Sequence, residues 1–485
     1  MIQRFLSNKI RSALPFTPNS GQETLIGQLA EFLFTQAERP CFVLRGYAGT
    51  GKSSIVGALV KALQALEQPI VLMAPTGRAA KVLARYAGHP AYTIHKQIYR
   101  RAQAAGEQFN LGFNNQSNTL FVVDEASMLS AERDNAVFGS GSLLDDLIRY
   151  VFMQNGNRLL LLGDDAQLPP VGHDESPALN PDYLLSYGLD VHTGTLTEVA
   201  RQAGDSGILL NATRLRQTKD IIPLTETDDL QLHPPIEMVE QIEQSYHTVG
   251  IEETLIITRS NRRTNLYNQG VRAQLLDYDE LLNTGDRIMV SRNNSFQTAS
   301  YKDDKGEPLI PFLANGDMFQ VVRLRKHHEM YGFQFAEAEL QGLDYPYEIT
   351  VLVWLDTLVT PTPEDSYKLQ RELYQRIAED YPEIRSKREL NERIQASPYY
   401  NALQIRYAYA VTCHKAQGGQ WQHVFIDQGP TAIPNTENPE PSNNRSRLAE
   451  IRTENRGPRL DNAPDYRWLY TALTRATERV WVLRA

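Results

Sequence analysis

The chain alternates short apolar runs with stretches whose apolar residues recur at helical spacing. The apolar runs have strand length, and each ends in a polar loop: 41–45, 70–74, 119–123 and 158–162. Between these runs, apolar residues recur mainly at helical spacing, for example over 54–66. Strands that alternate with helices are typical of a parallel sheet covered on both faces. We therefore predict a doubly wound α/β domain in the first part of the chain.

A second α/β region follows a stretch at 205–250 that is helical and then rich in Pro, Asp and Thr. Its expected elements are a strand at 254–258, a helix at 261–275, a strand at 404–411, a helix at 466–474 and a strand at 479–483. Residues 429–465 are rich in Pro, Asn and Arg and predict a long, mobile loop.

The pattern changes within the second region, between the expected helix at 261–275 and the expected strand at 404–411. Segments 285–291, 315–323 and 347–355 alternate and are β-branched or aromatic, which predicts a small antiparallel barrel. Segment 365–396 carries dense charge of both signs with apolar residues at helical spacing. We expect one or two exposed helices there, forming an arm that projects from the barrel.

Residues 46–53 read Gly-Tyr-Ala-Gly-Thr-Gly-Lys-Ser, the pattern of a phosphate-binding loop between a strand and a helix. Glycines allow the backbone N–H groups to face a phosphate, and the helix dipole favours the same anion. Lys52 is expected to neutralise the β- and γ-phosphates, and the Ser53 hydroxyl to bind Mg²⁺. The simpler alternative is a glycine-rich turn before an ordinary helix.

Polar residues at the ends of later strands extend this prediction. Asp124 and Glu125 close an apolar strand, where Asp124 is expected to bind Mg²⁺ and Glu125 to deprotonate the attacking water. The alternative is a pair that caps the next helix. Gln167 is positioned to sense the γ-phosphate, Arg201 offers a cation, and the amide of Gln22 suits an adenine edge unless it is simply solvated.

Composition narrows the class of protein. The chain has 485 residues, of which 41% are hydrophobic and 22% charged, as in soluble proteins of several domains. No apolar run suggests a membrane span or a secretory signal. Two cysteines, Cys41 and Cys413, provide no disulfide or zinc framework, so we expect a reducing, cytoplasmic location. The net charge of −9 argues against a protein coated in nucleic acid but not against a local basic groove.

Taken in order, the motifs resemble those of superfamily 1 helicases of the B-type group, which includes RecD-, Dda- and Pif-like enzymes. The motifs are GYAGTGKSS, APTGRAAKVL, TIHK, VVDEAS, GDDAQLPPVG, LTEVARQ, YAVTCHKAQGGQ and YTALTRA. The resemblance covers nearly the whole chain. A Pif-like signature segment is not clear between Leu143 and Gly163, which favours a RecD- or Dda-like enzyme.

The resemblance implies two RecA-like P-loop domains with parallel sheets, an inserted SH3-like β-barrel and a helical arm. The implied divisions are 1–204 for the first domain with a pin insertion at about 99–118, 205–284 and 401–485 for the second, and 285–400 for the barrel and arm.

The resemblance also assigns roles to single residues. Catalytic roles fall on Lys52, Asp124, Glu125, Gln167, Arg201 and Arg475, with Arg475 as an arginine finger from the second domain. ATP contacts fall on Gln22, Gly46, Ala48, Gly49, Thr50, Gly51, Lys52, Ser53, Ser54 and Gly418, and Mg²⁺ contacts on Ser53 and Asp124. Contacts to single-stranded DNA fall on Pro75, Thr76, Arg78, Thr93, His95, Thr412 and His414. Phe109 or Phe113 is expected at the tip of a strand-separating pin.

The function expected from this resemblance is ATP-dependent, 5′→3′ translocation by a monomer on single-stranded and forked DNA, with duplex unwinding in replication, recombination or repair. The residues leave two alternatives open: an RNA-directed helicase, and an accessory ATPase subunit of a recombination or exonuclease complex.

Overall fold

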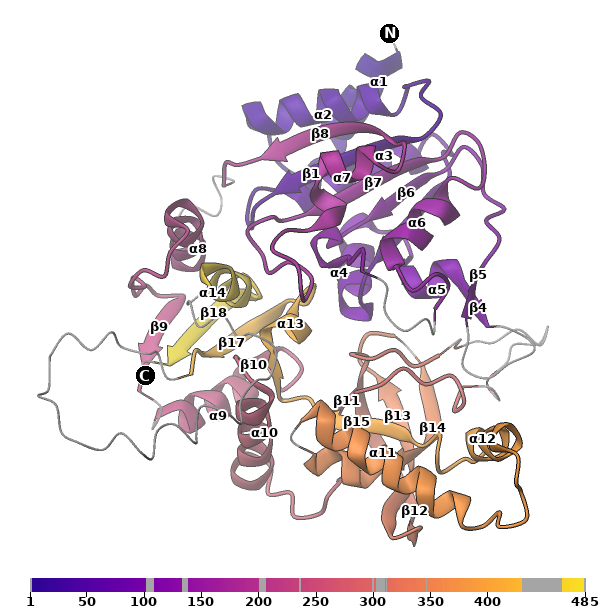
Figure 1. Cartoon of the computed structure of the whole chain (residues 1–485). Coiled ribbons are helices and arrows are strands. Elements are labelled where there is room, and N and C mark those ends of the chain that lie inside the picture. The colour runs from indigo at the N-terminus through magenta and orange to yellow at the C-terminus, as the bar shows by residue number, and fades with distance from the viewer. Residues whose placement is uncertain are drawn as a thin grey trace, which may run out of the picture.

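The computed structural model describes residues 2–101, 109–132, 138–199, 206–234, 237–298, 301, 310, 312–345, 347–360, 362–429 and 465–483. These residues form two parallel sheets with their helices, a closed barrel and two helices packed on that barrel (Figure 1). We call the first sheet with its helices the first lobe and the second sheet with its helices the second lobe. Within the described part of the chain, no helix combines the length and apolarity needed to span a bilayer.

The first lobe is a six-stranded, all-parallel sheet in the order β3-β2-β6-β7-β1-β8. Its strands are β1 (Pro40–Gly46), β2 (Ile70–Ala74), β3 (Ala91–Thr93), β6 (Leu120–Val123), β7 (Arg158–Gly163) and β8 (Asp190–Leu196). Its helices are α1 (Ile2–Ala13), α2 (Ser20–Phe32), α3 (Lys52–Gln64), α4 (Gly77–Ala87), α5 (Ile94–Ile98), α6 (Leu143–Val151) and α7 (Pro181–Leu185), with short 3₁₀ turns at Ala126–Met128 and Pro177–Leu179.

Strand β1 shows why the strands of this sheet are continuous apolar runs in the sequence. Side chains alternate along a strand, so Phe42 and Leu44 pack with α1, α2 and α3, whereas Cys41 and Val43 pack on the opposite face with α5, α6 and α7. Both faces are covered, and strands of this kind carry apolar residues at every position. The predicted α/β class is confirmed.

The second lobe is a five-stranded, all-parallel sheet in the order β16-β10-β17-β18-β9. Its strands are β9 (Leu230–His233), β10 (Thr254–Thr258), β16 (Ala410–Thr412), β17 (Trp421–Asp427) and β18 (Ala476–Leu483). Its helices are α8 (Gly207–Thr218), α9 (Met238–Thr248), α10 (Asn261–Gly270), which runs into a π-helical turn at Val271–Leu275, α13 (Cys413–Ala416) and α14 (Tyr466–Leu473). Strands β9 and β17 were not expected from the sequence. The predicted loop at 429–465 lies outside the described residues except at its two ends.

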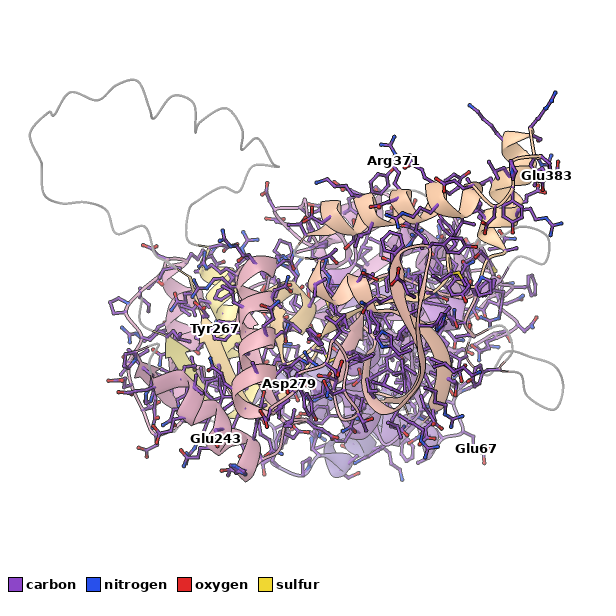
Figure 2. All side chains as sticks on the ribbon, turned by 90° about the horizontal axis from the view of Figure 1, so that it is seen from below. Glu67, Glu243, Tyr267, Asp279, Arg371 and Glu383 are labelled. Atoms are coloured by element: carbon purple, nitrogen blue, oxygen red, sulfur yellow. The ribbon has the colours of Figure 1, made fainter. Side chains whose placement is uncertain are left out.

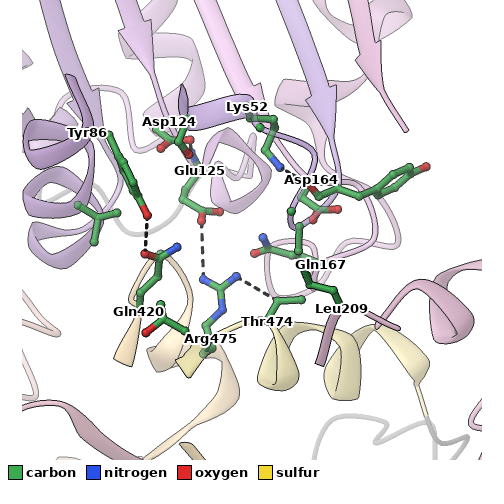
Figure 3. Close-up of a pocket in the computed structure, with 18 of the residues that line it drawn as sticks. Lys52, Tyr86, Asp124, Glu125, Asp164, Gln167, Leu209, Gln420, Thr474 and Arg475 are labelled. Atoms are coloured by element: carbon green, nitrogen blue, oxygen red, sulfur yellow. Dashed lines mark hydrogen bonds and ion pairs between the residues drawn. The ribbon is translucent and has the colours of Figure 1, made fainter. Parts of the chain in front are cut away.

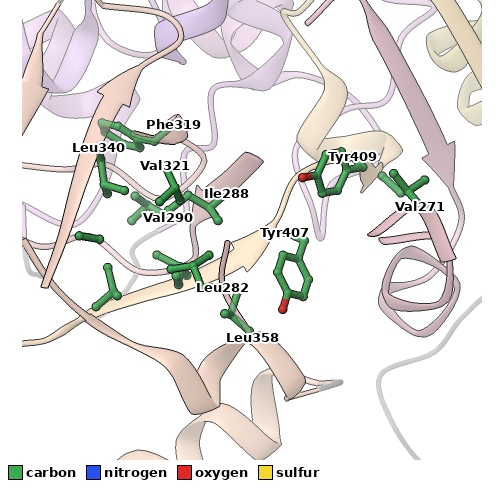
Figure 4. Packing of buried hydrophobic residues seen from close by; sticks show 14 of the residues in the cluster. Val271, Leu282, Ile288, Val290, Phe319, Val321, Leu340, Leu358, Tyr407 and Tyr409 are labelled. Atoms are coloured by element: carbon green, nitrogen blue, oxygen red, sulfur yellow. The ribbon is translucent and has the colours of Figure 1, made fainter. Parts of the chain in front are cut away.

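The barrel contains β11 (Arg287–Val290), β12 (Met318–Met330), β13 (Phe333–Gly342), β14 (Glu348–Trp354) and β15 (Leu403–Tyr407). A 3₁₀ turn at Leu355–Val359 follows β14. Phe319, Val321 and Leu340 fill its interior together with residues of β11 (Figure 4). Neighbouring strands are antiparallel except β14 and β15, which pair in parallel and close the barrel.

Segment 404–411 differs from the prediction of one strand in the second α/β region. β15 belongs to the barrel, and only β16 joins the second sheet. Asn268 makes this crossing possible because its amide nitrogen donates to the carbonyls of Tyr407 and Ala410, at 3.3 and 3.1 Å. Its amide oxygen accepts from the N–H groups of Tyr409 and Ala410. The backbone therefore changes sheets with its polar groups satisfied.

The charged segment forms α11 (Pro363–Ala378) and α12 (Lys387–Gln395). Their polar side chains face outward, as Arg371 does in Figure 2. Their apolar face is not exposed, however, because Leu373, Ile377 and Ile394 are buried in a separate core with Trp354 and its neighbours on the barrel. The arm therefore lies against the barrel instead of projecting freely from it.

Candidate functional site

The loop at 46–53 connects β1 to α3 as the sequence predicts. Gly51 has a φ of +88°, and a Cβ at this position would lie only 2.7 Å from the amide nitrogen of Gln22. Glycine is therefore required by both backbone conformation and space. The turn points the N-terminus of α3 into a cavity, where it offers the backbone N–H groups and dipole that suit a phosphate.

That cavity, of about 530 Å³, lies between the two lobes (Figure 3). Eleven of the residues predicted from the sequence line it: Ala48, Gly49, Gly51, Lys52, Ser53, Ser54, Asp124, Glu125, Gln167, Gly418 and Arg475. Residues from both ends of the chain thus meet at one place. Gly418 of the second lobe approaches the first so closely that a Cβ would lie 2.8 Å from that of Ala79.

Lys52 begins α3 and turns back toward its own loop. Its Nζ donates to the carbonyl oxygens of Gly46 and Tyr47, the latter at 3.1 Å. An ammonium group held by two carbonyls beside a helix N-terminus can exchange those partners for phosphate oxygens, which carry more negative charge.

Asp124 and Glu125 follow the end of β6. The N–H of Glu125 donates to Asp124 Oδ1 at 2.8 Å, and Glu125 has a φ of +51°, a conformation that costs a non-glycine residue energy. Burial, followed by the neighbouring charge of Glu125, raises the pKa of Asp124 to about 6, whereas the charges of Lys52 and Arg475 oppose this shift. A further cation is the partner that would keep this carboxylate ionised.

Arg475 enters the cavity from the second lobe, directly after α14. The residue is 4% exposed, and its guanidinium donates to the carbonyls of Thr471 and Gly419, at 3.1 and 3.2 Å. Its Nη1 lies 3.7 Å from Glu125 Oε1 across the cavity. The side chain is therefore fixed by its own lobe and directed at the other (Figure 3).

The oxygen donors at the first lobe fit Mg²⁺. A carboxylate (Asp124) and a hydroxyl (Ser53) line the same cavity, and Mg²⁺ is commonly held by one or two such groups together with substrate phosphates and water. A dedicated cage is absent: the described residues contain no cluster of three or more His, Cys, Asp or Glu side chains suited to a metal.

Three predicted nucleotide residues do not line the cavity. Gln22 is 2% exposed and braces the loop by donating to the carbonyl of Thr50 at 3.0 Å. Thr50 is buried, and Gly46 contributes through the carbonyl that holds Lys52. Arg201 lies outside the described residues.

Sequence reasoning missed several lining residues. Tyr86 and Gln420 meet across the cavity through a 3.2 Å hydrogen bond, and Leu209, Thr474 and Asp164 complete the wall. Asp164 was the most visible of these, because it directly follows an apolar strand as Asp124 does. Nothing in the sequence around Tyr86 or Gln420 indicates a nucleotide site, since Tyr86 lies in an ordinary helical pattern and Gln420 in an ordinary loop.

The residues predicted to contact single-stranded DNA lie at or just beyond the carboxyl ends of β2, β3 and β16. Thr76 caps α4 and Thr93 caps α5, each through its hydroxyl. Pro75 lies directly before Thr76, Thr412 directly precedes α13, and His414 is exposed as the second residue of α13. In open α/β sheets this edge is where ligands bind.

His95 and Arg78 are more enclosed than their predicted role suggests. The His95 ring packs between Tyr99, Phe138 and Phe312, and burial lowers its pKa to about 4, so the ring is neutral. Arg78 donates to the carbonyl of Gln420 at 3.0 Å and pairs with the carboxylate of Asp344, which follows β13 of the barrel.

The predicted pin begins as a two-stranded sheet of β4 (Tyr99–Arg101) and β5 (Phe109–Leu111), and the residues joining them are outside the described set. Phe109 starts β5, is 4% exposed and stacks on Phe138 with ring centres 4.8 Å apart. Phe113 follows β5 and is 70% exposed. Of the two candidates, only Phe113 presents its ring to solvent.

Two family models match parts of this chain, and parts of its sequence are similar to known proteins. Residues 18–232 match a family model described as an AAA domain, and residues 407–437 match the UvrD-like helicase C-terminal domain. The ATP-dependent RecD2 DNA helicase of Deinococcus radiodurans is 32% identical over 192 residues, which are 40% of this chain and 24% of that protein. The uncharacterized protein R530 of Acanthamoeba polyphaga mimivirus is 29% identical over 182 residues, 33% of this chain and 34% of that protein. The chain thus spans only about a quarter to a third of these relatives.

Among solved structures, the Pif1 helicase from Bacteroides in complex with ADP-AlF3 and ssDNA aligns with a TM-score of 0.45 and 15% identity, covering 97% of this chain and 93% of that one. The Pif1 helicase from Candida albicans aligns with a TM-score of 0.39 and 16% identity, covering 97% and 95%. The two family models and the RecD2 relative confirm the resemblance of this chain to RecD-like helicases.

Proposed function

We propose that this protein is an ATP-dependent DNA helicase that moves 5′→3′ along a single strand and unwinds duplex DNA. The observation that carries the proposal is that Lys52 of the first lobe and Arg475 of the second line one cavity between the lobes. A triphosphate bound there contacts cations from both sides, so its binding favours closure of the lobes. Removal of the γ-phosphate weakens that contact and favours opening.

The chain's own residues account for the hydrolytic step. The backbone N–H groups of the loop and Lys52 hold the phosphates, and Glu125 accepts a proton from the attacking water. Arg475 stabilises the charge that develops on the γ-phosphate. Ser53 and Asp124 would hold Mg²⁺, which when bound neutralises phosphate charge.

Translocation follows if both lobes grip one strand while their separation changes. The proposed contacts to a sugar–phosphate backbone come from Thr76 and Thr93 of the first lobe and Thr412 of the second, at the carboxyl ends of their strands. Alternating grip during closure and opening moves the protein along the strand. The 5′→3′ polarity, action as a monomer, a cytoplasmic location and a role in replication, recombination or repair belong to the proposal because the family resemblance implies them.

The decisive experiment compares Lys52→Ala with Lys61→Ala, which alters an exposed lysine of the same helix. Lys52→Ala is expected to abolish ATP hydrolysis while single-strand binding survives, and Lys61→Ala should behave as wild type. Hydrolysis that persisted in Lys52→Ala would refute the assigned site.

Substrate and polarity need a separate assay. Hydrolysis is measured with DNA and RNA oligonucleotides of one sequence, and unwinding with forked duplexes that carry a 5′ or a 3′ tail. DNA stimulation and unwinding from the 5′ tail are expected. Preferential stimulation by RNA would favour an RNA-directed enzyme, and hydrolysis without unwinding by the isolated chain would favour an accessory subunit.

A further inference from the structure

Tyr470 joins the two lobes through a single hydroxyl group. It lies on α14 of the second lobe and is 1% exposed. Its hydroxyl donates to Asp164 Oδ2 at 2.6 Å and accepts from the backbone N–H of Ala48 at 3.0 Å. One side chain therefore contacts both the loop that follows β7 and the phosphate-binding loop.

Two further buried bonds tie the same loop to the second lobe. The N–H of Leu168 donates to the hydroxyl oxygen of Thr471 at 2.9 Å, and the amide of Gln417 donates to the Leu168 carbonyl at 2.8 Å. Thr471 is fully buried and Gln417 is 5% exposed. Leaving a buried backbone group without a hydrogen-bond partner costs free energy. We therefore expect Leu168 of the first lobe to move together with the second lobe.

Gln167 lies between these anchor points. Asp164 fixes the turn by accepting from the N–H of Ala166 at 3.0 Å, and Leu168 fixes the other side. Gln167 lines the cavity, and its Oε1 atom is buried with no hydrogen-bond partner among the described residues. Its position relative to a bound γ-phosphate is thus set by bonds to the opposite lobe.

We infer that Tyr470 is a positioning residue which, with Thr471, holds the loop at 164–168 and so couples Gln167 to the separation of the lobes. The inference rests on the proposed function and deepens it, because it assigns the regulation of hydrolysis to named bonds across the cleft. Any opening of the cleft must carry this loop along or break three buried hydrogen bonds.

The test is Tyr470→Phe, which removes the hydroxyl and keeps the ring. Affinity for ADP is expected to stay within about twofold, and the KM for ATP to change little. The kcat stimulated by single-stranded DNA should fall about tenfold, since loss of a buried hydrogen bond to a charged group has an effect of this order. Thr471→Val, which removes the bond to Leu168, should reduce the same stimulation.

Tyr409→Phe is the matched control. The Tyr409 hydroxyl donates to Asp286 at 2.8 Å and accepts from the N–H of Arg287 at 3.2 Å, so it makes the same two kinds of bond, but to residues outside the loops at 46–53 and 164–168. Both Tyr→Phe variants should lose comparable thermal stability, but only Tyr470→Phe should lose stimulation by DNA. A purely structural role of Tyr470 would make the two variants alike.

Binding of ADP with aluminium fluoride provides a readout that does not depend on helicase activity. Tyr470→Phe is expected to weaken it about tenfold while ADP alone binds normally. Wild-type stimulation together with wild-type affinity for ADP–aluminium fluoride would overturn the inference. A wild-type chain that binds nucleotide without stimulation by DNA would contradict the proposed function instead, and the fluoride comparison would still decide the role of Tyr470.

Discussion

The guanidinium of Arg475 lies 3.7 Å from the carboxylate of Glu125, although the two residues come from opposite lobes. Both side chains are largely enclosed, with 5% and 19% of their surfaces exposed. The acid proposed to accept a proton from water and the cation proposed to stabilise phosphate charge thus face each other across the cavity. The pair also forms an attraction between the lobes that a bound γ-phosphate would intensify or replace.

Arg475→Lys is expected to lower the kcat for ATP hydrolysis by at least about 100-fold, because a lysine keeps the charge but loses the guanidinium fork. Affinity for ADP, which lacks the γ-phosphate, should change little. Steady-state hydrolysis and ADP binding measure the two effects. Arg479→Lys, at an exposed position on β18, is the control and should retain wild-type hydrolysis. Equal effects at both positions would show that Arg475 does not act on phosphate.

Gln22→Ala is expected to weaken ATP and GTP by similar factors of about three to ten. The Gln22 amide accepts from the N–H of Asn19 and donates to the carbonyl of Thr50, both at 3.0 Å, so its loss removes a capping box and a brace of the phosphate loop. Competition with a fluorescent nucleotide measures both affinities. Gln28→Ala alters an exposed glutamine of the same helix and should have no effect. A selective loss of affinity for ATP would support the adenine-reading role predicted from the sequence.

Asp344→Asn should tighten binding of single-stranded DNA about three- to tenfold at low salt. Asp344 lies after β13 of the barrel, with its Oδ1 3.5 Å from Arg78 of the first lobe, and its neighbour Leu343 accepts from Lys81. The barrel thus holds Arg78, one of the cations predicted to contact DNA phosphate. Removal of the carboxylate charge frees Arg78 for DNA.

Fluorescence anisotropy across a salt series measures this effect. One additional phosphate contact should make the decrease of log affinity with log salt steeper by roughly 0.7. Glu348→Gln, on the exposed side of β14, is the control. Weaker binding by Asp344→Asn would show that the ion pair to Arg78 supports the DNA-binding conformation.

Asp317 predicts a pH dependence of stability. Burial raises its pKa to about 7, with a smaller contribution from Asp344, whereas Lys96 and the N–H of Ala314 oppose the shift. A raised carboxylate pKa means that the folded state holds the proton more tightly. The contribution of Asp317 to stability is therefore complete below about pH 4 and is lost as pH rises to about 7, by about 1.4 kcal/mol for each pH unit.

Asp317→Asn should remove this dependence. Its free energy of unfolding should exceed that of wild type at pH 8, and the difference should shrink toward pH 4.5. Urea unfolding at both pH values measures it, with the exposed Asp279→Asn as control. A difference that did not change with pH would mean that Asp317 is ionised in the folded protein throughout this range.

Local patterns were sufficient for much of this protein. The apolar runs of β1, β2, β6 and β7 predicted a parallel sheet because strands buried on both faces must be apolar throughout. The loop at 46–53 and the pair Asp124–Glu125 were recognisable because their chemistry needs neighbouring residues in a set order. Arg475 required the order of all the motifs, since nothing beside it indicates a nucleotide.

Tertiary structure decided the remainder, because the relevant contacts join residues far apart in the chain. Segment 404–411 reads as one strand, but Asn268 allows it to leave the barrel and enter a different sheet. The bond between Tyr470 and Asp164 spans 306 residues, and the pairing of Arg78 with Asp344 depends on how the barrel meets the first lobe. A sequence pattern reports which face of an element is apolar, whereas the partner that covers this face is chosen by packing of the whole chain.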